Sequence, residues 1–359
     1  MQTLIVAAGR FDGELASRIL AGREPRLDVF ELRDALDARL LDFQALDQSR
    51  RPGVALLRRA LGDSAALAWL AFRERDRAEV ILTTGEDIGI PLAALLGAGR
   101  AQAAHVMIAH TLSPARKRPF FTVLKLYRRM DRILCYATSE ERLMTGRLGI
   151  PSAQVQRIAY HADERFFRPM PEVPVEPDLI CGAGQLLRDY DTLLKACEGL
   201  SVRVRVAAGS PWISSELRPG SALPAWADWR RYDRFALRDL YARSAIAVVP
   251  LLENDYQTGI STILEMMAMG KALIVTRTRG QTDTIVDGET GLYVPPGDPA
   301  ALRAAIELLR RAPEEAARLG RNARRYLEQH AGLDLFTRRL KQALVEAHAA
   351  RFGAARGAA

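Results

Sequence analysis

Short, continuous apolar runs recur along the first half of the chain. They lie at residues 3–9, 80–85, 104–109 and 132–137, and each either ends in a glycine or is followed directly by a polar residue. Runs of this length, without polar alternation, are typical of strands buried on both faces of a parallel sheet. Patterns with helical spacing lie among them, at residues 14–20, 52–71 and 139–148. Strand alternating with helix predicts a doubly wound α/β domain.

The same alternation restarts after a proline-rich stretch at residues 169–178, which holds four prolines and predicts a stiff, extended linker. Beyond it the pattern predicts strands at 179–182, 202–208, 246–251 and 272–276, helices at 191–198, 237–244 and 261–269, and a loop at 209–229. The predicted organisation is a first domain at 1–168, a hinge at 169–178, a second domain at 179–335, and a C-terminal helix at 336–359. We expect that helix to pack back on the first domain and to end in a frayed tail.

Composition agrees with a globular protein of about two domains, because the chain has 359 residues, 48% hydrophobic and 26% charged. Lys and Arg together number 51 against 43 Asp and Glu, a net charge of +8. That excess indicates an anionic partner, such as nucleic acid, a phosphorylated ligand or an acidic membrane surface. No nucleic-acid-binding motif accompanies the charge, so we do not expect nucleic acid.

The three cysteines, Cys135, Cys181 and Cys197, are far apart and form no C-x-x-C pair. This spacing predicts neither a zinc site nor a redox motif, and free buried thiols indicate a cytoplasmic protein. No uncharged apolar stretch approaches about 18 residues, so we expect no membrane-spanning helix.

The chemistry is concentrated after the strand that ends near Pro250. A polar loop closes with Thr258-Gly259, and a helix follows that Ser261 or Thr262 is expected to cap. Glycine lets a ligand approach the backbone, and the first amides of a helix favour an anionic group such as a diphosphate. Glu265 lies one turn into the helix, where a carboxylate can accept hydrogen bonds from ribose hydroxyls. The pattern predicts a nucleotide site formed by Thr258, Gly259, Ile260, Ser261 and Glu265.

This stretch resembles the carboxyl-terminal domain of family 4 retaining glycosyltransferases. The matching segments are residues 160–169, 182–190, 265–270, 287–292 and 295–298. The resemblance implies the GT-B fold, an α/β architecture of two Rossmann-like parallel-sheet domains that face each other across a cleft. It implies metal-independent transfer of a hexose from a nucleotide diphosphate sugar, a UDP-sugar before GDP-mannose, with no cofactor. The acceptor would bind the first domain, and lipid, cell-envelope glycan and small-molecule acceptors all fit.

The resemblance also implies residue roles. Arg188 stands where a basic residue holds the donor diphosphate, with Gln185 the nearest polar group to a second basic position that is missing here. His110 matches a histidine near the transferred sugar, and Gln257 stands where the family has a glutamate that contacts that sugar. Glutamine keeps the hydrogen-bonding capacity but not the charge. These three, His110, Gln257 and Arg188, are the predicted catalytic residues, and Gly9 is either a donor contact or a tight turn.

Two other functions remain open. Gln257 motivates a catalytically weak or inactive relative that acts as a binding subunit, and a nucleotide-sugar epimerase shares the same architecture. Asp189-x-Asp191 spells a metal-binding D-x-D motif, but a strand-to-helix turn is where aspartate caps a helix, so we expect no metal site. The glycines Gly182 and Gly184 lack the third glycine of a dinucleotide fingerprint, which makes NAD a weak alternative.

A basic segment from Arg116 to Arg132 lies in the first domain. At helical spacing its apolar residues share one face and basic residues surround them; these are Phe120, Val123, Leu124 and Tyr127. The pattern predicts either peripheral contact with an anionic membrane, at its cytoplasmic face, or a domain helix packed on its sheet.

Overall fold

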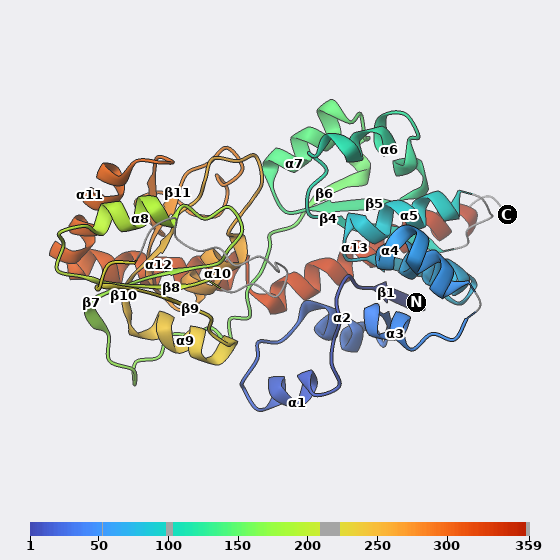
Figure 1. The fold of residues 1–359 in the computed structure, drawn as a ribbon. Coiled ribbons are helices and arrows are strands. Elements are labelled where there is room, and N and C mark those ends of the chain that lie inside the picture. The colour runs from blue at the N-terminus through green and yellow to red at the C-terminus, as the bar shows by residue number, and fades with distance from the viewer. Residues whose placement is uncertain (52, 98–102, 209–222, 357–359) are drawn as a thin grey trace. The chain divides into compact units, whose positions relative to one another are not determined.

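The structure is a computed structural model that describes residues 1–359 except 52, 98–102, 209–222 and 357–359. The described chain divides into two compact units (Figure 1). The first comprises Met1–Ser17, Arg26–Ala159 and Phe336–Ala359, and the second comprises Arg18–Pro25 and Tyr160–Leu335. The predicted hinge at 169–178 therefore lies within the second unit, and its last three residues already belong to a strand.

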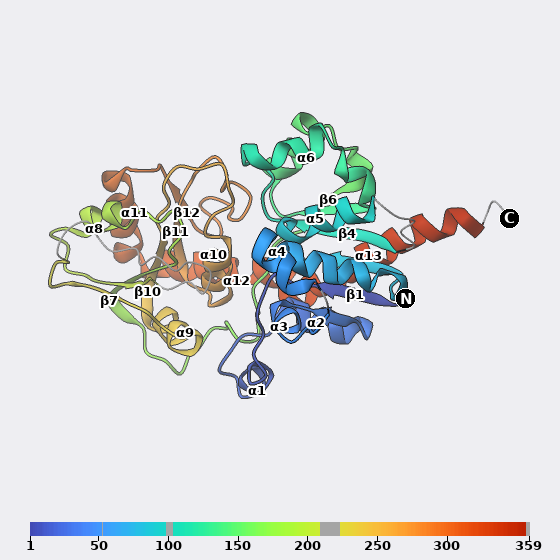
Figure 2. The same cartoon turned by 45° about the vertical axis from the view of Figure 1, so that its right-hand side comes forward.

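The first unit is built on a six-stranded parallel sheet in the order β2-β1-β3-β4-β5-β6. Its strands are β1 (Thr3–Val6), β2 (Arg39–Leu41), β3 (Val80–Thr83), β4 (Ala104–Ala109), β5 (Arg132–Cys135) and β6 (Val155–Arg157). Its α-helices are α2 (Asp28–Leu36), α3 (Phe43–Asp47), α4 (Val54–Arg73), α5 (Glu86–Leu96), α6 (Arg118–Thr122), α7 (Thr138–Arg142) and most of α13 (Leu333–Arg356). The short α1 (Leu15–Leu20) spans a unit boundary. Helices α4 and α5 lie beside each other in both views (Figures 1 and 2).

The second unit repeats this architecture with a parallel sheet in the order β12-β11-β10-β7-β8-β9. Its strands are β7 (Glu176–Ala183), β8 (Arg203–Ala207), β9 (Ala227–Arg230), β10 (Ser244–Val249), β11 (Ala272–Thr276) and β12 (Leu292–Val294). Its helices are α8 (Tyr190–Cys197), α9 (Arg234–Arg243), α10 (Ile260–Ala268), α11 (Pro299–Arg311) and α12 (Pro313–His330).

Side chains of the second sheet alternate between two apolar cores. Along β7, Leu179 and Cys181 face the core that α9, α10 and α12 cover. Ile180, between them, faces the core that α8 and α11 cover. Both faces of the strand are thus removed from water, which explains why its sequence shows no polar alternation. The prediction of a doubly wound α/β fold is confirmed.

Several local predictions differ from the structure. Strand β9 overlaps the end of the predicted 209–229 loop, of which residues 209–222 lie outside the described part. The predicted helix at 139–148 is α7 continued by a π-helix at Leu143–Arg147. Helix α13 continues to Arg356, and residues 357–359 of the predicted frayed tail lie outside the described residues. No helix in the described ranges is long and apolar enough to cross a membrane.

Candidate functional site

The carboxyl ends of β7 and β10 form the topological switch point of the second sheet, because the chain builds outward from β7 on one side and returns to β10 on the other. Ligands of open parallel sheets bind in the crevice outside such a point. The loops that follow the two strands are tied together there. The Asp189 amide donates to the Pro250 carbonyl at 3.1 Å, and the Leu252 amide donates to the Leu187 carbonyl at 3.0 Å.

Helix α10 starts from the second of these loops, and its cap differs from the prediction. The N-cap is Gly259, whose φ of 81° is left-handed, and no side chain caps the helix. The prediction that Ser261 or Thr262 caps it is wrong, because both already lie inside the helix: Ser261 is exposed, and the Thr262 hydroxyl accepts from Arg188 at 3.3 Å. Because glycine has no side chain, no side-chain oxygen from the N-cap accepts the backbone N–H groups of Ile260 and the next residues. These amides at the helix start are therefore available to a ligand.

Arg188 lies buried at the switch point. Its Nε donates to the Ala183 carbonyl at 2.9 Å, and its Nη1 donates to the Leu186 carbonyl at 2.8 Å. These acceptors are neutral, and among the described residues no carboxylate lies within ion-pair distance of Arg188. Burial lowers the pKa of this guanidinium, while the more distant charge of Glu265 opposes that shift. A buried cation without a direct anionic partner is suited to an incoming anion.

Two glycines keep the space around that guanidinium open. A Cβ on Gly184 would lie 2.2 Å from Nη2 of Arg188, and one on Gly259 would lie 3.5 Å from Nη1. Both glycines have positive φ, 95° and 81°, so the backbone also disfavours other residues. At both positions the guanidinium of Arg188 therefore lies next to backbone atoms alone, with no side chain between it and an approaching ligand.

Glu265 lies in α10 with both carboxylate oxygens in hydrogen bonds. Oε1 accepts from Nη1 of Arg234 at 2.9 Å, and Oε2 accepts from the hydroxyl of Tyr241 at 3.2 Å. Burial raises the pKa of Glu265, and the charge of Arg234 is the largest influence that lowers it. A carboxylate has about four acceptor sites, so two remain for hydroxyl groups of a ligand.

The loop before α10 is held by an amide network. The Thr258 hydroxyl donates to Asn254 at 2.6 Å, and the fully buried Gln281 donates to the Thr258 carbonyl at 2.9 Å. Gln257 is fixed less firmly, since its Nε2 lies 3.5 Å from the Thr284 hydroxyl, and its buried Oε1 accepts no hydrogen bond from the described residues. Gln257 is thus the residue of this loop whose side-chain amide can still form hydrogen bonds with a ligand.

The first unit presents His110 at the carboxyl end of β4. The ring is exposed, and its Nε2 lies 2.9 Å from the Thr84 carbonyl that follows β3. The buried Glu86 accepts the backbone N–H of His110 at 2.9 Å, which fixes the turn. Gly9 follows β1 and is buried; a Cβ there would lie 2.8 Å from the Phe11 ring, so close packing accounts for this glycine.

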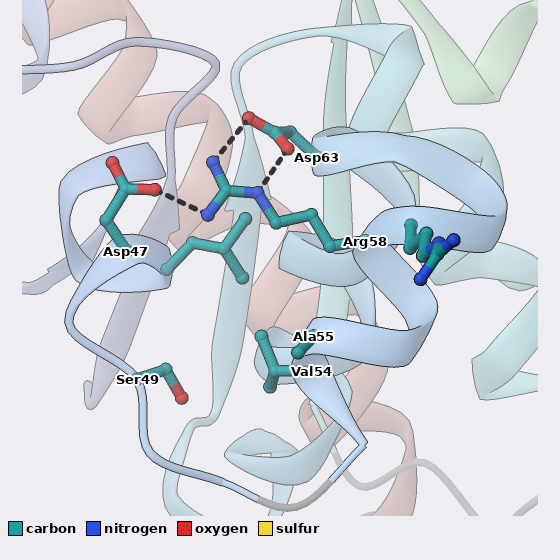
Figure 3. A pocket seen from close by; sticks show the side chains of 8 residues that line it. Asp47, Ser49, Val54, Ala55, Arg58 and Asp63 are labelled. Carbon is teal, nitrogen blue, oxygen red and sulfur yellow. Dashed lines mark hydrogen bonds and ion pairs between the residues drawn. The ribbon is translucent and has the colours of Figure 1, made fainter.

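A cavity of about 510 Å³ lies elsewhere in the first unit, between α3 and α4 (Figure 3). Three of its four charged groups pair with one another, since Arg58 lies 2.7 Å from Asp47 and 2.6 Å from Asp63, whereas Arg59 is exposed and forms no ion pair with a described residue. Because most of its charge is already neutralised, this cavity is a weaker candidate site than the switch point.

The structure brings together most of the predicted donor residues around the switch point of the second sheet: Gln185, Arg188, Thr258, Gly259, Ile260, Ser261 and Glu265, with Gln257 on the same loop. Gln185 is buried there. His110 and Gly9 belong to the first unit.

Sequence reasoning missed Arg234 and Tyr241, because neither lies in a matching segment. Asp189 caps α8 by accepting from the Thr192 amide at 3.1 Å. Across the described residues, no three His, Cys, Asp or Glu side chains are grouped so that they could hold a metal ion.

Comparison with known proteins agrees with this geometry. Residues 181–311, which include Arg188 and Glu265, match the family model described as "Glycosyl transferases group 1". The D-rhamnosyltransferase WbpZ of Pseudomonas aeruginosa is 27% identical over 208 residues, which cover 56% of this chain and 49% of that protein. The chain thus spans about half the length of the curated relative that it matches.

Solved structures resemble nearly the whole chain. Anabaena Alr3699/HepE in complex with UDP-glucose has a TM-score of 0.71 at 14% identity, covering 96% of this chain and 100% of that one. The sucrose-phosphate synthase of Thermosynechococcus elongatus has a TM-score of 0.67 at 16% identity, covering 98% and 100%. The fold is therefore that of GT-B glycosyltransferases, as the sequence resemblance implies.

Proposed function

We propose that the protein is a family 4 retaining glycosyltransferase, which moves a hexose from a nucleotide diphosphate sugar to a lipid or cell-envelope glycan. The observation that carries the proposal is the switch point of the second sheet. There a buried guanidinium without a carboxylate partner lies beneath two glycines and beside a helix start, and Glu265 follows one turn later. The family match over residues 181–311 supports a glycosyl donor at this place.

In the proposed mechanism the donor diphosphate binds the first amides of α10 and the charge of Arg188. The ribose hydroxyls donate to Glu265. The bond between the sugar carbon and the diphosphate breaks, the acceptor oxygen bonds to the same face of that carbon, and the acceptor proton passes to the departing diphosphate. Arg188 and the amides stabilise the charge that develops on the leaving group, so the chemistry requires no metal or cofactor. Gln257 and His110 contact the transferred sugar.

A UDP-sugar is our first choice of donor and GDP-mannose the second. The complex of Alr3699/HepE with UDP-glucose supports this order. The reaction is placed in the cytoplasm, where nucleotide sugars are available to an acceptor at the inner face of the membrane.

The unused amide of Gln257 favours one second candidate, a donor-binding subunit with little or no turnover. An amide cannot stabilise positive charge on a departing sugar as a carboxylate can, whereas it can hold a hydroxyl. A third candidate, a nucleotide-sugar epimerase, would form product without any acceptor.

The test begins with a thermal-shift screen of UDP-, GDP- and ADP-sugars, because a ligand bound only by the folded state raises the midpoint. The selected donor, labelled in the sugar, is then incubated with lipid and glycan acceptors and either the wild-type protein or Glu265→Ala. Acceptor-dependent transfer by the wild type, strongly reduced in the variant, supports the proposal. Binding without transfer supports the binding subunit, and conversion without acceptor supports the epimerase. No shift with any donor refutes all three.

A further inference from the structure

The segment from residue 115 to residue 129 follows the turn that bears His110, and it is not the amphipathic helix that the sequence predicts. It consists of a 3-10 turn (Ala115–Lys117), the short α6 and a second 3-10 turn (Leu126–Arg129). The helix ends at Thr122, and Lys125 has a left-handed φ of 49° that reverses the chain. The expected common face of Phe120, Val123, Leu124 and Tyr127 is therefore wrong.

What the segment presents instead is an apolar tip. Phe121 is fully buried in the core of the first unit and anchors α6. Its neighbours are exposed, at 37% for Phe120, 73% for Val123 and 59% for Leu124. In the ribbon, α6 lies above β4 and β5 in both views (Figures 1 and 2). Three large apolar side chains within five residues thus face solvent from a segment that is itself firmly anchored.

The charge around this tip has one sign. Residues 115–130 contain six cations and no Asp or Glu. Two of the cations act internally, since Lys117 pairs with Glu86 at 2.5 Å and Arg118 donates to the Ser113 carbonyl at 2.9 Å. The other four are exposed and form no ion pair with any described residue: Arg116, Lys125, Arg128 and Arg129. Elsewhere exposed arginines are commonly neutralised, as Arg203 is by Asp178 at 2.7 Å.

We propose that residues 115–129 dock the protein on an anionic lipid bilayer. Lipid headgroups neutralise the four unpaired cations, while the tip of Phe120, Val123 and Leu124 enters the boundary between headgroups and acyl chains. Charge complementarity alone would also suit nucleic acid. Two adjacent exposed aliphatic side chains gain nothing from a phosphate backbone, however, whereas they gain from removal from water.

The docking segment is joined to the His110 turn through one carboxylate. Glu86 accepts both the backbone N–H of His110, at 2.9 Å, and the ammonium of Lys117. That ammonium also donates to the Thr111 carbonyl at 3.1 Å. A bilayer held by the segment therefore lies against the same unit, and next to the same turn, that carries His110. The docking is independent of the donor site; only the delivery of an amphiphilic acceptor to His110 rests on the proposed function.

The apolar part of the proposal is tested by flotation of the full chain with vesicles of neutral phosphatidylcholine, with or without about one third anionic phosphatidylglycerol. The variant is Val123→Ser with Leu124→Ser, and the matched control is Leu308→Ser with Val345→Ser, which removes two similarly exposed apolar side chains elsewhere. We expect the wild type and the control to float with anionic vesicles, and the variant to bind at least ten-fold more weakly. Equal loss in both variants would overturn the role of the tip.

The electrostatic part is tested with Lys125→Gln and Arg128→Gln together. The matched control, Arg321→Gln with Arg325→Gln, removes the same charge from exposed, unpaired positions of α12. Each headgroup contact is worth about five-fold in partitioning, so we expect about a 25-fold loss for the first pair and little change for the control. Binding of the wild type should fall steeply in 0.5 M salt.

Three results would overturn the proposal: no flotation of the wild type, equal binding to neutral vesicles, or binding to duplex DNA that depends on the same residues without vesicle binding. The UDP thermal shift of each variant is recorded alongside. Val123, Leu124, Lys125 and Arg128 all belong to the first unit, so the shift of the two variants that change them should equal that of the wild type. A vesicle-binding protein without any donor shift would refute the proposed function and leave the docking intact.

Discussion

Replacing Arg234 by methionine tests whether Glu265 is held as a buried carboxylate. Methionine keeps an apolar stem but removes the guanidinium that donates to Oε1 at 2.9 Å. Removing one partner of a fully buried ion pair costs about 3–5 kcal/mol. The Arg234 side chain is 37% exposed, so solvent screens the pair, and we expect a loss of about 2 kcal/mol in the free energy of unfolding.

The loss should depend on pH with a defined sign. Burial already raises the pKa of Glu265 in the folded protein, and removing Arg234 raises that pKa further. When a carboxyl group binds its proton more tightly in the folded state, the protein loses stability as the pH rises from the unfolded pKa of that group to its folded pKa. In Arg234→Met this interval extends to higher pH than in the wild type. The deficit of the variant should therefore be small near pH 5 and grow toward pH 8.

Calorimetric unfolding of both proteins between pH 5 and pH 8 measures this deficit. A loss of about 2 kcal/mol lowers the midpoint of the second unit by about 4–8 °C. Arg243→Met is the control, because Arg243 lies on the same helix in exposed pairs with Asp239 and Glu176, and losing such pairs should change the midpoint little. Equal midpoints at pH 8, or a deficit that does not change with pH, would refute the description of Glu265 as a desolvated carboxylate.

Three further outcomes follow from other parts of the structure. Gly280→Ala should lower the unfolding midpoint and weaken donor binding, because its Cβ would lie 2.1 Å from the Tyr256 carbonyl oxygen, whereas Gly146→Ala, which meets nothing within 4 Å, should do neither. The pKa of the fully buried His105 is lowered to about 4, so stability should fall by up to about 3 kcal/mol as the pH drops from about 6.5 to 4; a urea titration series should show a shallower fall in His105→Asn. Burial raises the pKa of all three thiols, so native protein should resist iodoacetamide at pH 8 and react only when unfolded, as mass spectrometry would show for Cys135, Cys181 and Cys197.

The sequence predicts the fold well where strands are buried on both faces. Runs such as residues 246–251 leave few alternatives, and β10 lies within two residues of that prediction. Short edge strands were missed, because β2 and β9 carry too few consecutive apolar residues to differ from a loop. The 115–129 segment was misjudged because helical spacing alone reveals neither the end of α6 at Thr122 nor the left-handed conformation of Lys125 that follows.

The candidate site was predictable only where it is formed by residues close together in the sequence. A glycine followed by a helix start, with an acid one turn later, can be read from local sequence, and Gly259 and Glu265 lie where that pattern places them. Arg234 and Tyr241 reach Glu265 from α9, and a contact between two helices leaves no local trace in the sequence. The burial of Arg188 without a carboxylate partner likewise depends on how two loops meet.

The most direct test of the account is a calorimetric titration of UDP and 2′-deoxy-UDP into the wild type and Glu265→Gln. If Glu265 accepts the ribose hydroxyls, the wild type should prefer UDP by about ten-fold or more, since a hydrogen bond to a charged group is worth about 1.5–3 kcal/mol. Glu265→Gln should bind UDP more weakly and lose most of this preference. An equal preference in both proteins, or no binding of UDP, GDP or ADP to the wild type, would contradict the assignment of the second unit as a nucleotide-sugar site.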